Sequence, residues 1–342
     1  MKAVRIHEHG GPEVLRYEDI PEPVLPFGHV LVRVRACALN HLDLWVRQGI
    51  PGQKIPLPHI LGSDVAGEIA AAGEGCSRLK AGERVLLSPA QSCRQCQFCV
   101  SGQDNFCRQY NLLGHGLDGG NVEYIAVPEV YAIPIPAGMS FEEAAATPLV
   151  FLTAWHMLVG RAKIRPGEEV LVLSASSGVG SAAVQIAKLW ECRVIATAGG
   201  AEKMERARAL GADEVIDHYQ QDISDEVKRL TGKRGVDVVL EHVGAATWDH
   251  SIASLAHHGR LVTCGATTGP QAGIDLRRLF ARQLSLLGSF MGTLGELHEV
   301  LAFVFSRRLR PIVDQVFPMS EIRAAHERLE RKEQFGKVLV AP

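Results

Sequence analysis

Residues 170–189, VLVLSASSGVGSAAVQIAKL, are the segment most informative about the fold of this chain. Its first four residues form an uninterrupted apolar run, which is typical of a buried strand. A turn of serines and glycines follows over 176–180, and residues 182–189 have the apolar spacing of an amphipathic helix. A strand that leads through a glycine turn into a helix predicts a parallel sheet with crossover helices.

The same alternation continues downstream, so residues 151–290 are expected to form a doubly wound parallel α/β sheet of the Rossmann type. A second helix is predicted over 202–210, and Gly211 ends it. Further strands are predicted over the apolar runs 193–196, 214–216, 236–240, 260–264 and 285–287.

Residues 1–150 have a different pattern, with short predicted strands and no long helix. A chain of 342 residues is too long for one ordinary core, so a second, strand-rich domain is expected here. The predicted strands of this domain cover 2–6, 30–36, 65–70 and 84–88. In the last segment, residues 291–342, two helical stretches flank 311–318 and a final strand covers 337–340.

Composition limits the possible partners. The chain is 46% hydrophobic and 22% charged, and its net charge of -2 gives no basis for binding nucleic acid or an anionic membrane. No run reaches the roughly 18–20 apolar residues that span a bilayer. The first ten residues hold no apolar core of a secretory signal. We therefore expect a cytoplasmic protein with a small-molecule substrate and with neither nucleic acid nor membrane as partner.

The most specific local motif is the spacing Cys93-x2-Cys96-x2-Cys99-x7-Cys107 within the lobe at about 90–110. Two-residue gaps let thiolates converge on one ion, and zinc in structural sites prefers four such ligands. The residues between them are too polar for buried thiols. Four reduced cysteines and an iron–sulfur cluster are the alternatives, although the Cys-Pro ending of a common ferredoxin motif is absent. The lobe is predicted to hold one structural zinc.

The glycine turn after residue 173 predicts a dinucleotide site, because it brings a pyrophosphate close to the N–H groups of a helix N-terminus. Two registers fit: Gly178-x-Gly180-x-x-Ala183, or one through Ala175, Ser177 and Gly180.

The end of the second strand indicates which dinucleotide binds. It reads Ala196-Thr-Ala-Gly-Gly200 and has no carboxylate to bind the adenosine ribose. Lys203 follows, and His218 lies at the end of the third strand. This combination favours NADP(H) over NAD(H), although Lys203 is also interpretable as a solvated helix residue.

Three further motifs complete a pattern: GSDVAG at 62–67, LTAW at 152–155 and FGK at 335–337. Together with the cysteine lobe and the glycine turn, they resemble the medium-chain dehydrogenase/reductase superfamily, which includes zinc alcohol dehydrogenases and quinone oxidoreductases. The resemblance covers essentially the whole chain. It implies a GroES-like catalytic domain interrupted by the Rossmann domain, with the segment 291–342 returning to the former.

The resemblance also implies an enzyme that transfers hydride between NAD(P)(H) and a small molecule. It implies a homodimer or homotetramer that forms through an edge strand of the cofactor domain, for which the apolar segment 285–291 is the candidate. The implied cofactor-binding residues are Thr153, Ser177, Gly178, Val179, Gly180, Lys203, His218, His242, Val243, Gly265, Ala266 and Lys337.

The chain departs from the zinc alcohol dehydrogenases at the catalytic metal. In those enzymes a cysteine and a histidine are the first two ligands, and here the corresponding residues are Asn40 and Ser63. The third ligand position falls near Leu149. None of these is an ordinary zinc ligand. Cys37 lies three residues early and, on a strand, would face the opposite side. The sequence therefore predicts that the catalytic zinc is absent.

Without this Lewis acid, oxidation of a plain alcohol loses the main means of stabilising an alkoxide, whereas a quinone or a conjugated enone is already electrophilic. The segment Leu39-Asn-His-Leu-Asp43 resembles the Leu-Asn-x-x-Asp context of the zinc-free quinone reductases. Our hypothesis is that Asn40, Ser63 or His41 hydrogen-bonds the developing oxyanion, and that His41 or a water returns the proton. The candidate catalytic residues are Asn40, His41, Asp43, Ser63 and Asp64.

Simpler roles stay open for these residues. Asn40 also fits as the cap of a short helix, and Asp43 as the partner of Arg47 one turn later. Ser63 and Asp64 also fit as turn residues. Among enzymes, the alternative is a zinc alcohol dehydrogenase with an unusual ligand set drawn from His41, Asp43, Asp64 and His59. Outside enzymes, the alternative is a dinucleotide-binding protein without turnover, because a fold does not establish activity.

Overall fold

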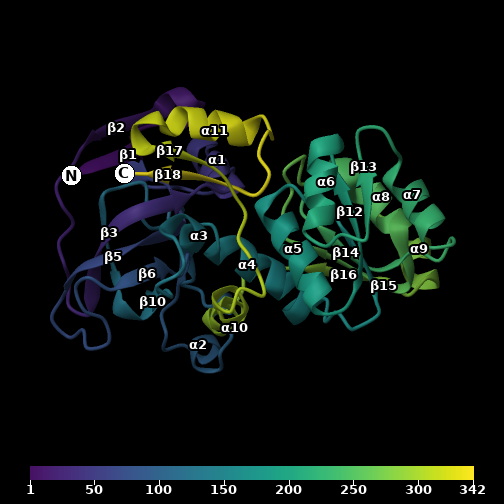
Figure 1. The fold of residues 1–342 in the computed structure, drawn as a ribbon, viewed down its shortest axis with the longest axis horizontal. Helices are drawn as coiled ribbons and strands as arrows, with labels where there is room; N and C mark the ends of the chain where they lie inside the picture. Colours follow the sequence, from purple (N-terminus) through teal and green to yellow (C-terminus); the bar gives the residue numbers. More distant parts are fainter. The chain divides into compact units, whose positions relative to one another are not determined.

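The computed structural model describes all residues, 1–342, and the chain divides into two units. Unit 1 consists of Met1–Leu149 and Arg310–Pro342, and unit 2 of Val150–Leu309 (Figure 1). The sequence placed the second boundary at 291. It lies at 310 instead, because helix α10 (Leu294–Phe305) packs within unit 2: the Phe303 ring lies 5.3 Å from that of Trp155, and Glu296 pairs with His156 at 2.8 Å.

Unit 2 contains the six-stranded parallel sheet that the sequence predicted, in the order β13-β12-β11-β14-β15-β16. Because all five pairings are parallel, the carboxyl ends of the strands share one edge. The strands are β11 (Glu169–Val172), β12 (Arg193–Ala198), β13 (Glu214–Asp217), β14 (Val236–Glu241), β15 (Leu255–Thr263) and β16 (Ser285–Gly288).

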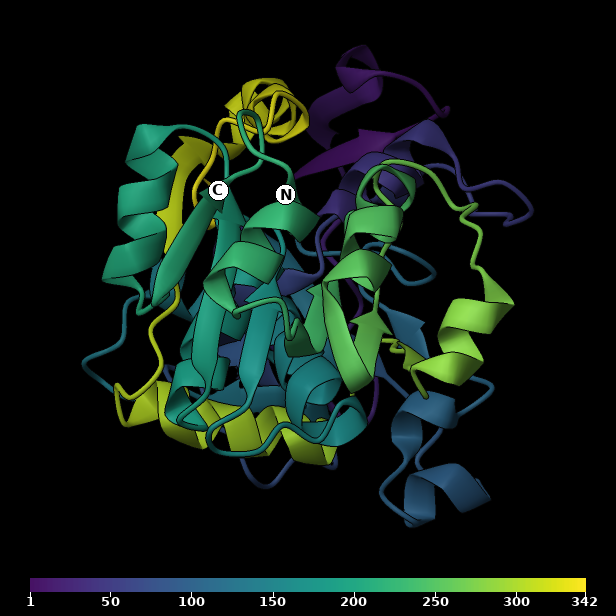
Figure 2. The same ribbon diagram turned by 90° about the vertical axis from the view of Figure 1, so that its right-hand side faces the viewer.

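Helices cover both faces of this sheet: Figure 1 shows α5 and α6 on one side of the strands and α7 and α8 on the other. Figure 2 shows the strands side by side between these layers. Besides α10, the helices are α4 (Pro148–Trp155), which spans the unit boundary, the π-helix His156–Arg161, α5 (Gly178–Leu189), α6 (Ala201–Ala209), α7 (Ile223–Leu230), α8 (Ala245–Ser254) and α9 (Leu276–Ala281). No helix of the chain is both long and apolar enough to cross a membrane.

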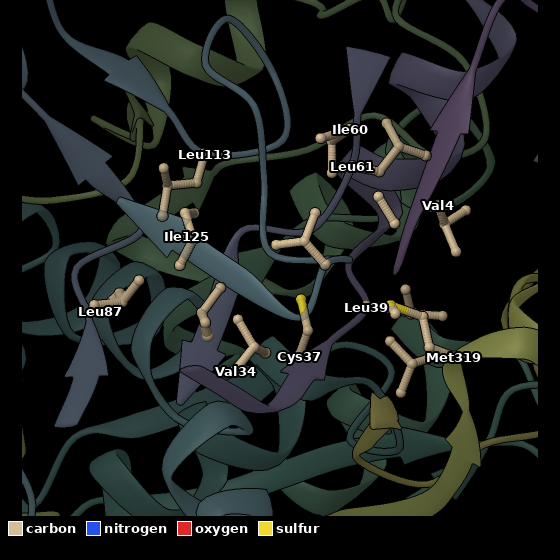
Figure 3. Close-up of a cluster of buried hydrophobic side chains, with 14 of the residues drawn as sticks. Val4, Val34, Cys37, Leu39, Ile60, Leu61, Leu87, Leu113, Ile125 and Met319 are labelled. Atoms are coloured by element: carbon tan, nitrogen blue, oxygen red, sulfur yellow. The ribbon is translucent and has the colours of Figure 1, made fainter. Parts of the chain in front are cut away.

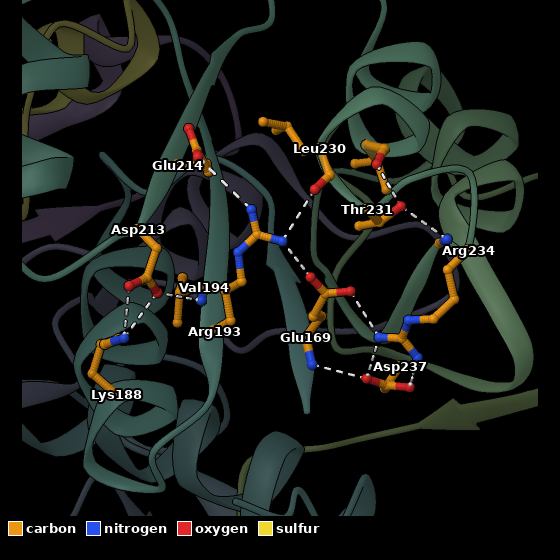
Figure 4. Close-up of polar contacts among 12 residues, drawn as sticks. Glu169, Lys188, Arg193, Val194, Asp213, Glu214, Leu230, Thr231, Arg234 and Asp237 are labelled. Atoms are coloured by element: carbon orange, nitrogen blue, oxygen red, sulfur yellow. Dashed lines mark hydrogen bonds and ion pairs between the residues drawn. The ribbon is translucent and has the colours of Figure 1, made fainter. Parts of the chain in front are cut away.

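An ion-pair network links the amino-terminal ends of the strands in the unit 2 sheet (Figure 4). Glu169, the first residue of β11, accepts hydrogen bonds from Arg193 and from Arg234, the latter at 2.7 Å. Asp237 of β14 also pairs with Arg234, at 2.7 Å, and accepts the Glu169 backbone N–H at 2.8 Å. These charges neutralise one another on the edge opposite the glycine turn.

Unit 1 is rich in strands, as predicted, and its largest sheet has the order β10-β6-β5-β3-β18-β17, with β9 also paired to β3. The returning strand β18 lies between β3 and β17. The strands of unit 1, in all of its sheets, are β1 (Lys2–Ile6), β2 (Leu15–Asp19), β3 (His29–Ala38), β4 (His59–Ile60), β5 (Asp64–Ala72), β6 (Arg84–Leu87), β7 (Ala90–Gln91), β8 (Asn111–Leu112), β9 (Tyr124–Pro128), β10 (Ala132–Pro134), β17 (Val313–Pro318) and β18 (Lys337–Ala341).

The core of unit 1 is an apolar cluster that includes Val34, Cys37 and Leu39 (Figure 3). Cys37 is buried in this core with its sulfur close to Gly62, and burial raises the pKa of its thiol well above the usual value. The helices of unit 1 are α1 (His41–Gln48), α2 (Gln97–Val100), α3 (Phe141–Ala145) and α11 (Ile322–Glu330), with 3-10 turns at Pro12–Val14, Asp104–Phe106, Glu129–Tyr131 and Met319–Glu321.

A buried arginine joins α1 to α11. Arg47 is fully buried; its guanidinium pairs with Glu330, bonds to Nδ1 of His326 at 3.1 Å and donates to the Gly10 carbonyl at 3.1 Å. The alternative in which Asp43 pairs with Arg47 one turn later is therefore wrong, because Arg47 turns towards α11. Burial and the neighbouring Arg47 charge lower the pKa of His326 to about 3.

His326 should make the stability of the protein depend on pH. In the folded chain His326 stays neutral, whereas in the unfolded chain it binds a proton below its ordinary pKa of 6.5. Acidification from pH 6.5 therefore favours the unfolded state by about 1.4 kcal/mol per pH unit from this group alone. Urea unfolding between pH 4.5 and 7.5 measures the slope. H326N keeps an acceptor near Nδ1 without titrating, so it should show a shallower slope; equal slopes would contradict this role.

Candidate active site

Asn40 and Asp43 together fix the N-terminus of α1. The Asp43 carboxylate accepts the Asn40 backbone N–H at 2.7 Å with one oxygen and the Gly62 N–H at 2.8 Å with the other. Burial raises the pKa of Asp43 to about 6, although both backbone donors favour its charged form. Gly62 has φ +102°, and a Cβ there would lie 2.6 Å from the Cys37 sulfur, so glycine is required. Asp43 thus connects α1 to the turn before β5.

A buried ion pair lies beside this turn. Lys337 is 3% exposed, and its ammonium contacts Oδ1 of Asn40 at 2.5 Å and Oδ2 of Asp64 at 3.0 Å. Asn40 Nδ2 donates to the same Asp64 oxygen at 3.0 Å, and the other Asp64 oxygen accepts the Leu149 N–H at 2.8 Å. Asn40, Asp64 and Lys337, called the lysine cluster below, form a closed network in which charge and hydrogen bonds are satisfied.

The network limits which predicted residues could bind an oxyanion. The side-chain N–H groups of Asn40 point to Asp64 and to the Ala38 carbonyl, and the Ser63 hydroxyl donates to the Leu113 carbonyl at 2.7 Å. The side chains of Asn40 and Ser63 therefore already donate their hydrogen bonds to acceptors within the protein. His41 is the first residue of α1 and is partly exposed. Lys337, which the sequence placed among the cofactor contacts, supplies a positive charge beside Asn40 and Asp64.

The residues at the catalytic-metal position do not fit zinc. Asn40 and Ser63 offer a neutral amide and a hydroxyl, and the Asn40 oxygen already accepts from an ammonium at 2.5 Å. The alternative ligand set that includes Asp43 and Asp64 does not fit zinc either, because both carboxylate oxygens of each residue already accept hydrogen bonds from the protein. His59 lies against Asp118 instead, with 3.3 Å between Nδ1 and the carboxylate.

The cysteine lobe fits a metal ion. The four sulfurs of Cys93, Cys96, Cys99 and Cys107 lie within 4.8 Å of one another. Backbone N–H groups of residues 95 and 96 lower the pKa of Cys93 to about 6, which favours the thiolate. Convergent sulfurs without a further position suit a closed tetrahedral site, and such a site holds the lobe together and does no chemistry.

The glycine turn of unit 2 follows the second of the two registers. A Cβ on Gly180 would lie 2.2 Å from the Ser174 carbonyl, so Gly180 is the glycine that lets α5 pack closely on β11. Ser177 is the N-cap of α5, and its hydroxyl accepts the Gly180 N–H at 2.9 Å. Gly178 and Val179 therefore form the first turn of the helix, where N–H groups lack helical acceptors.

The remaining cofactor candidates of unit 2 lie mostly at the carboxyl edge of its sheet. Lys203 lies in the first turn of α6 after β12, and His218 directly follows β13. The end of β12 is tight, since a Cβ on Gly199 would lie 2.2 Å from the Tyr219 ring. His242 and Val243 follow β14, Gly265 and Ala266 follow β15, and Thr153 is buried in α4.

Sequence reasoning missed Glu241, the buried last residue of β14. An acidic residue that ends the apolar run VDVVLE immediately before a turn was the available signal.

Comparisons with known proteins agree with this architecture. The family described as alcohol dehydrogenase GroES-like domain matches residues 27–137, and the family described as zinc-binding dehydrogenase matches residues 178–306. A human quinone oxidoreductase is 30% identical over 336 residues, covering 96% of this chain and 94% of its own. An alcohol dehydrogenase of Geobacillus stearothermophilus is 32% identical, covering 99% of each chain. A crystal structure named NAD-dependent alcohol dehydrogenase is 45% identical, with TM-score 0.97 and full coverage of both chains.

These matches confirm the GroES-like and Rossmann domains that the sequence predicted, and they cover both units of the structure. The relatives carry the names of enzymes that transfer hydride, so the chain is an NAD(P)-dependent oxidoreductase with a small-molecule substrate. It belongs to the medium-chain dehydrogenase/reductase superfamily, with the zinc-containing alcohol dehydrogenases and the quinone oxidoreductases.

Proposed function

We propose that this enzyme transfers hydride from NADPH to a quinone or a carbonyl-conjugated alkene, without a catalytic zinc. The lysine cluster is the observation that carries the proposal. A zinc ion bound to Asn40 would share one neutral oxygen with the Lys337 ammonium, which lies 2.5 Å from it. Two cations on one amide oxygen repel each other, and Ser63, at the second ligand position, is neither a thiolate nor an imidazole that could offset that repulsion.

In this mechanism the protein supplies orientation and electrostatics, and the nicotinamide supplies the hydride. The buried Lys337 ammonium provides a fixed positive charge, which would favour the negative charge that develops on the acceptor oxygen. Asn40 and Asp64 hold that ammonium in place. Asp43 positions the start of α1, and His41 at that start is the group we assign to returning the proton, directly or through water.

Alcohol oxidation is the second candidate, because two of the relatives carry the name alcohol dehydrogenase. With zinc it would require Asp64 to release Lys337 and the Leu149 N–H. Without zinc, alkoxide stabilisation would rest on Lys337 alone. Both requirements favour reduction of a quinone or a conjugated alkene over oxidation of an alcohol.

We also propose that the four cysteines hold one structural zinc per chain and that the enzyme is a homodimer or homotetramer. The convergent sulfurs support the zinc. Strand β16 supports the assembly, because it is an edge of the unit 2 sheet and is followed by Phe290, which is 61% exposed.

NADP(H) is the proposed cofactor, because β12 ends in Ala198 and two glycines without a carboxylate to repel a 2′-phosphate. Lys203 follows β12 closely in the sequence, and His218 directly follows β13, whose last residue pairs with Ala198. The solved relative at 45% identity is named NAD-dependent, so both dinucleotides belong in the test.

Neutralising the lysine cluster should slow catalysis without weakening cofactor binding. In K337M/D64N the ammonium is removed, and the amide oxygen introduced at position 64 still accepts the Leu149 N–H, so no buried charge is left alone. We expect kcat for quinone or enone reduction to fall about 10²-fold. The dissociation constant of NADPH should be unchanged. K337R keeps the charge and should retain most activity. A folded K337M/D64N with the kcat of the wild type would refute the role of Lys337.

Removing the Lys203 charge should weaken NADPH binding selectively. If Lys203 contacts the 2′-phosphate, K203Q loses a charge-assisted hydrogen bond, and the dissociation constant of NADPH should rise about tenfold. NADH binding should stay the same. Titration of nicotinamide fluorescence measures both constants. K228Q is the matched control, because Lys228 pairs with Asp225 on α7, far along the chain from the β12 end. Equal losses for NADPH and NADH would count against the 2′-phosphate contact.

A further inference from the structure

Glu241 is a fully buried carboxylate at the carboxyl end of β14. One oxygen accepts the backbone N–H groups of Val243 and Gly244, at 2.6 and 3.0 Å. The other accepts the Ser251 hydroxyl at 2.6 Å, and the Thr247 hydroxyl lies 3.1 and 2.9 Å from the two oxygens. All four donors are neutral. Hydrogen bonds to a carboxylate are stronger than neutral ones, so Glu241 holds the turn between β14 and α8 in one shape.

The turn at 242–244 also holds in place the loop that follows β15. The Val243 carbonyl accepts the Thr268 N–H at 2.8 Å and the Thr268 hydroxyl at 2.8 Å. The approach is close: a Cβ on Gly244 would lie 2.9 Å from the Cα of Ala266, and Gly244 has φ +97°. The turn at 242–244 and the loop at 265–269 therefore hold each other in place, and Glu241 binds the backbone of the turn.

The turn at 242–244 also reaches the cofactor turn. His242 Nε2 lies 2.9 Å from the Leu173 carbonyl and 3.4 Å from the Ser177 hydroxyl, which caps α5. Strands β11 and β14 are neighbours, but the chain leaves β11 towards β12 and leaves β14 towards β15. Ligands of doubly wound sheets bind at such a switch point, outside the carboxyl ends of the strands.

We propose that Glu241 is a positioning residue for the nicotinamide dinucleotide. Its carboxylate shapes the 242–244 turn, and through that turn the 265–269 loop and the Ser177 cap. The inference rests on the cofactor position of the proposed function. A neutral, shorter side chain would leave buried N–H groups without acceptors and free both segments to move.

The test compares E241A with E241Q by NADPH fluorescence titration and thermal unfolding. We expect E241A to raise the NADPH dissociation constant about tenfold or more. E241Q should restore binding to near the wild-type value, because Gln keeps one oxygen for the two backbone donors. Its Nε2 can donate to the hydroxyls of Thr247 and Ser251, which can rotate to accept. A role in stability alone would not predict this recovery of affinity.

D237N is the matched control, because Asp237 is a partly buried acid on the same strand at the opposite edge of the sheet (Figure 4). It should lower the unfolding temperature and leave NADPH binding intact. Equal affinity in E241A, D237N and the wild type would overturn the inference. If E241A does not fold, T247V removes the hydroxyl shared by both oxygens, and wild-type affinity there would overturn it too. A wild type that binds neither NADPH nor NADH would instead overturn the proposed function.

Discussion

The hydrogen-bonded ion pair of Lys337 with Asp64 and Asn40 is the interaction on which the catalytic half of this protein depends. An ammonium and a carboxylate removed from water are stable only when each finds all its partners, and here every one of the side-chain oxygens in the cluster has a donor. The resemblance to the zinc alcohol dehydrogenases places two residues at their metal-ligand positions, Asn40 of this cluster and Ser63 beside Asp64. The need to satisfy this buried ion pair therefore accounts both for the packing of the site and for the chemistry we assign to it.

The topology of unit 1 brings these residues together from distant parts of the sequence. In the central sheet Ala38 of β3 pairs with Asp64 of β5 on one side and with Leu339 of β18 on the other. Asn40 follows β3, Asp64 begins β5 and Lys337 begins β18, so three neighbouring strands deliver their ends to one place. The chain must leave unit 1, form unit 2 and return before the ammonium reaches its partners. This requirement explains why the C-terminal strand belongs to the catalytic unit.

Much of this arrangement was predictable from local sequence signals. Uniform apolar runs with glycine turns predicted the strands of unit 2, and the spacing of Cys93 to Cys107 predicted a cluster whose sulfurs do converge. Contacts between residues far apart in sequence were not predictable. The sequence did not show that Lys337 lies beside Asn40 and Asp64, or that Asp43 bonds to Gly62, because sequence spacing does not show which strand lies beside which. The boundary at 310 was missed for a similar reason, since the apolar face of α10 does not specify which unit it packs against.

The number and position of zinc ions per chain distinguish a metal-free site at Asn40 from a zinc-dependent one. We would crystallise the protein from zinc-supplemented buffer without chelator and measure anomalous scattering at the zinc edge, together with elemental analysis of the same sample. We expect one zinc per chain, bound by Cys93, Cys96, Cys99 and Cys107, and no anomalous peak beside Asn40. A second peak between Asn40 and Asp64, with Lys337 displaced, would contradict it and make zinc-dependent alcohol oxidation the better account.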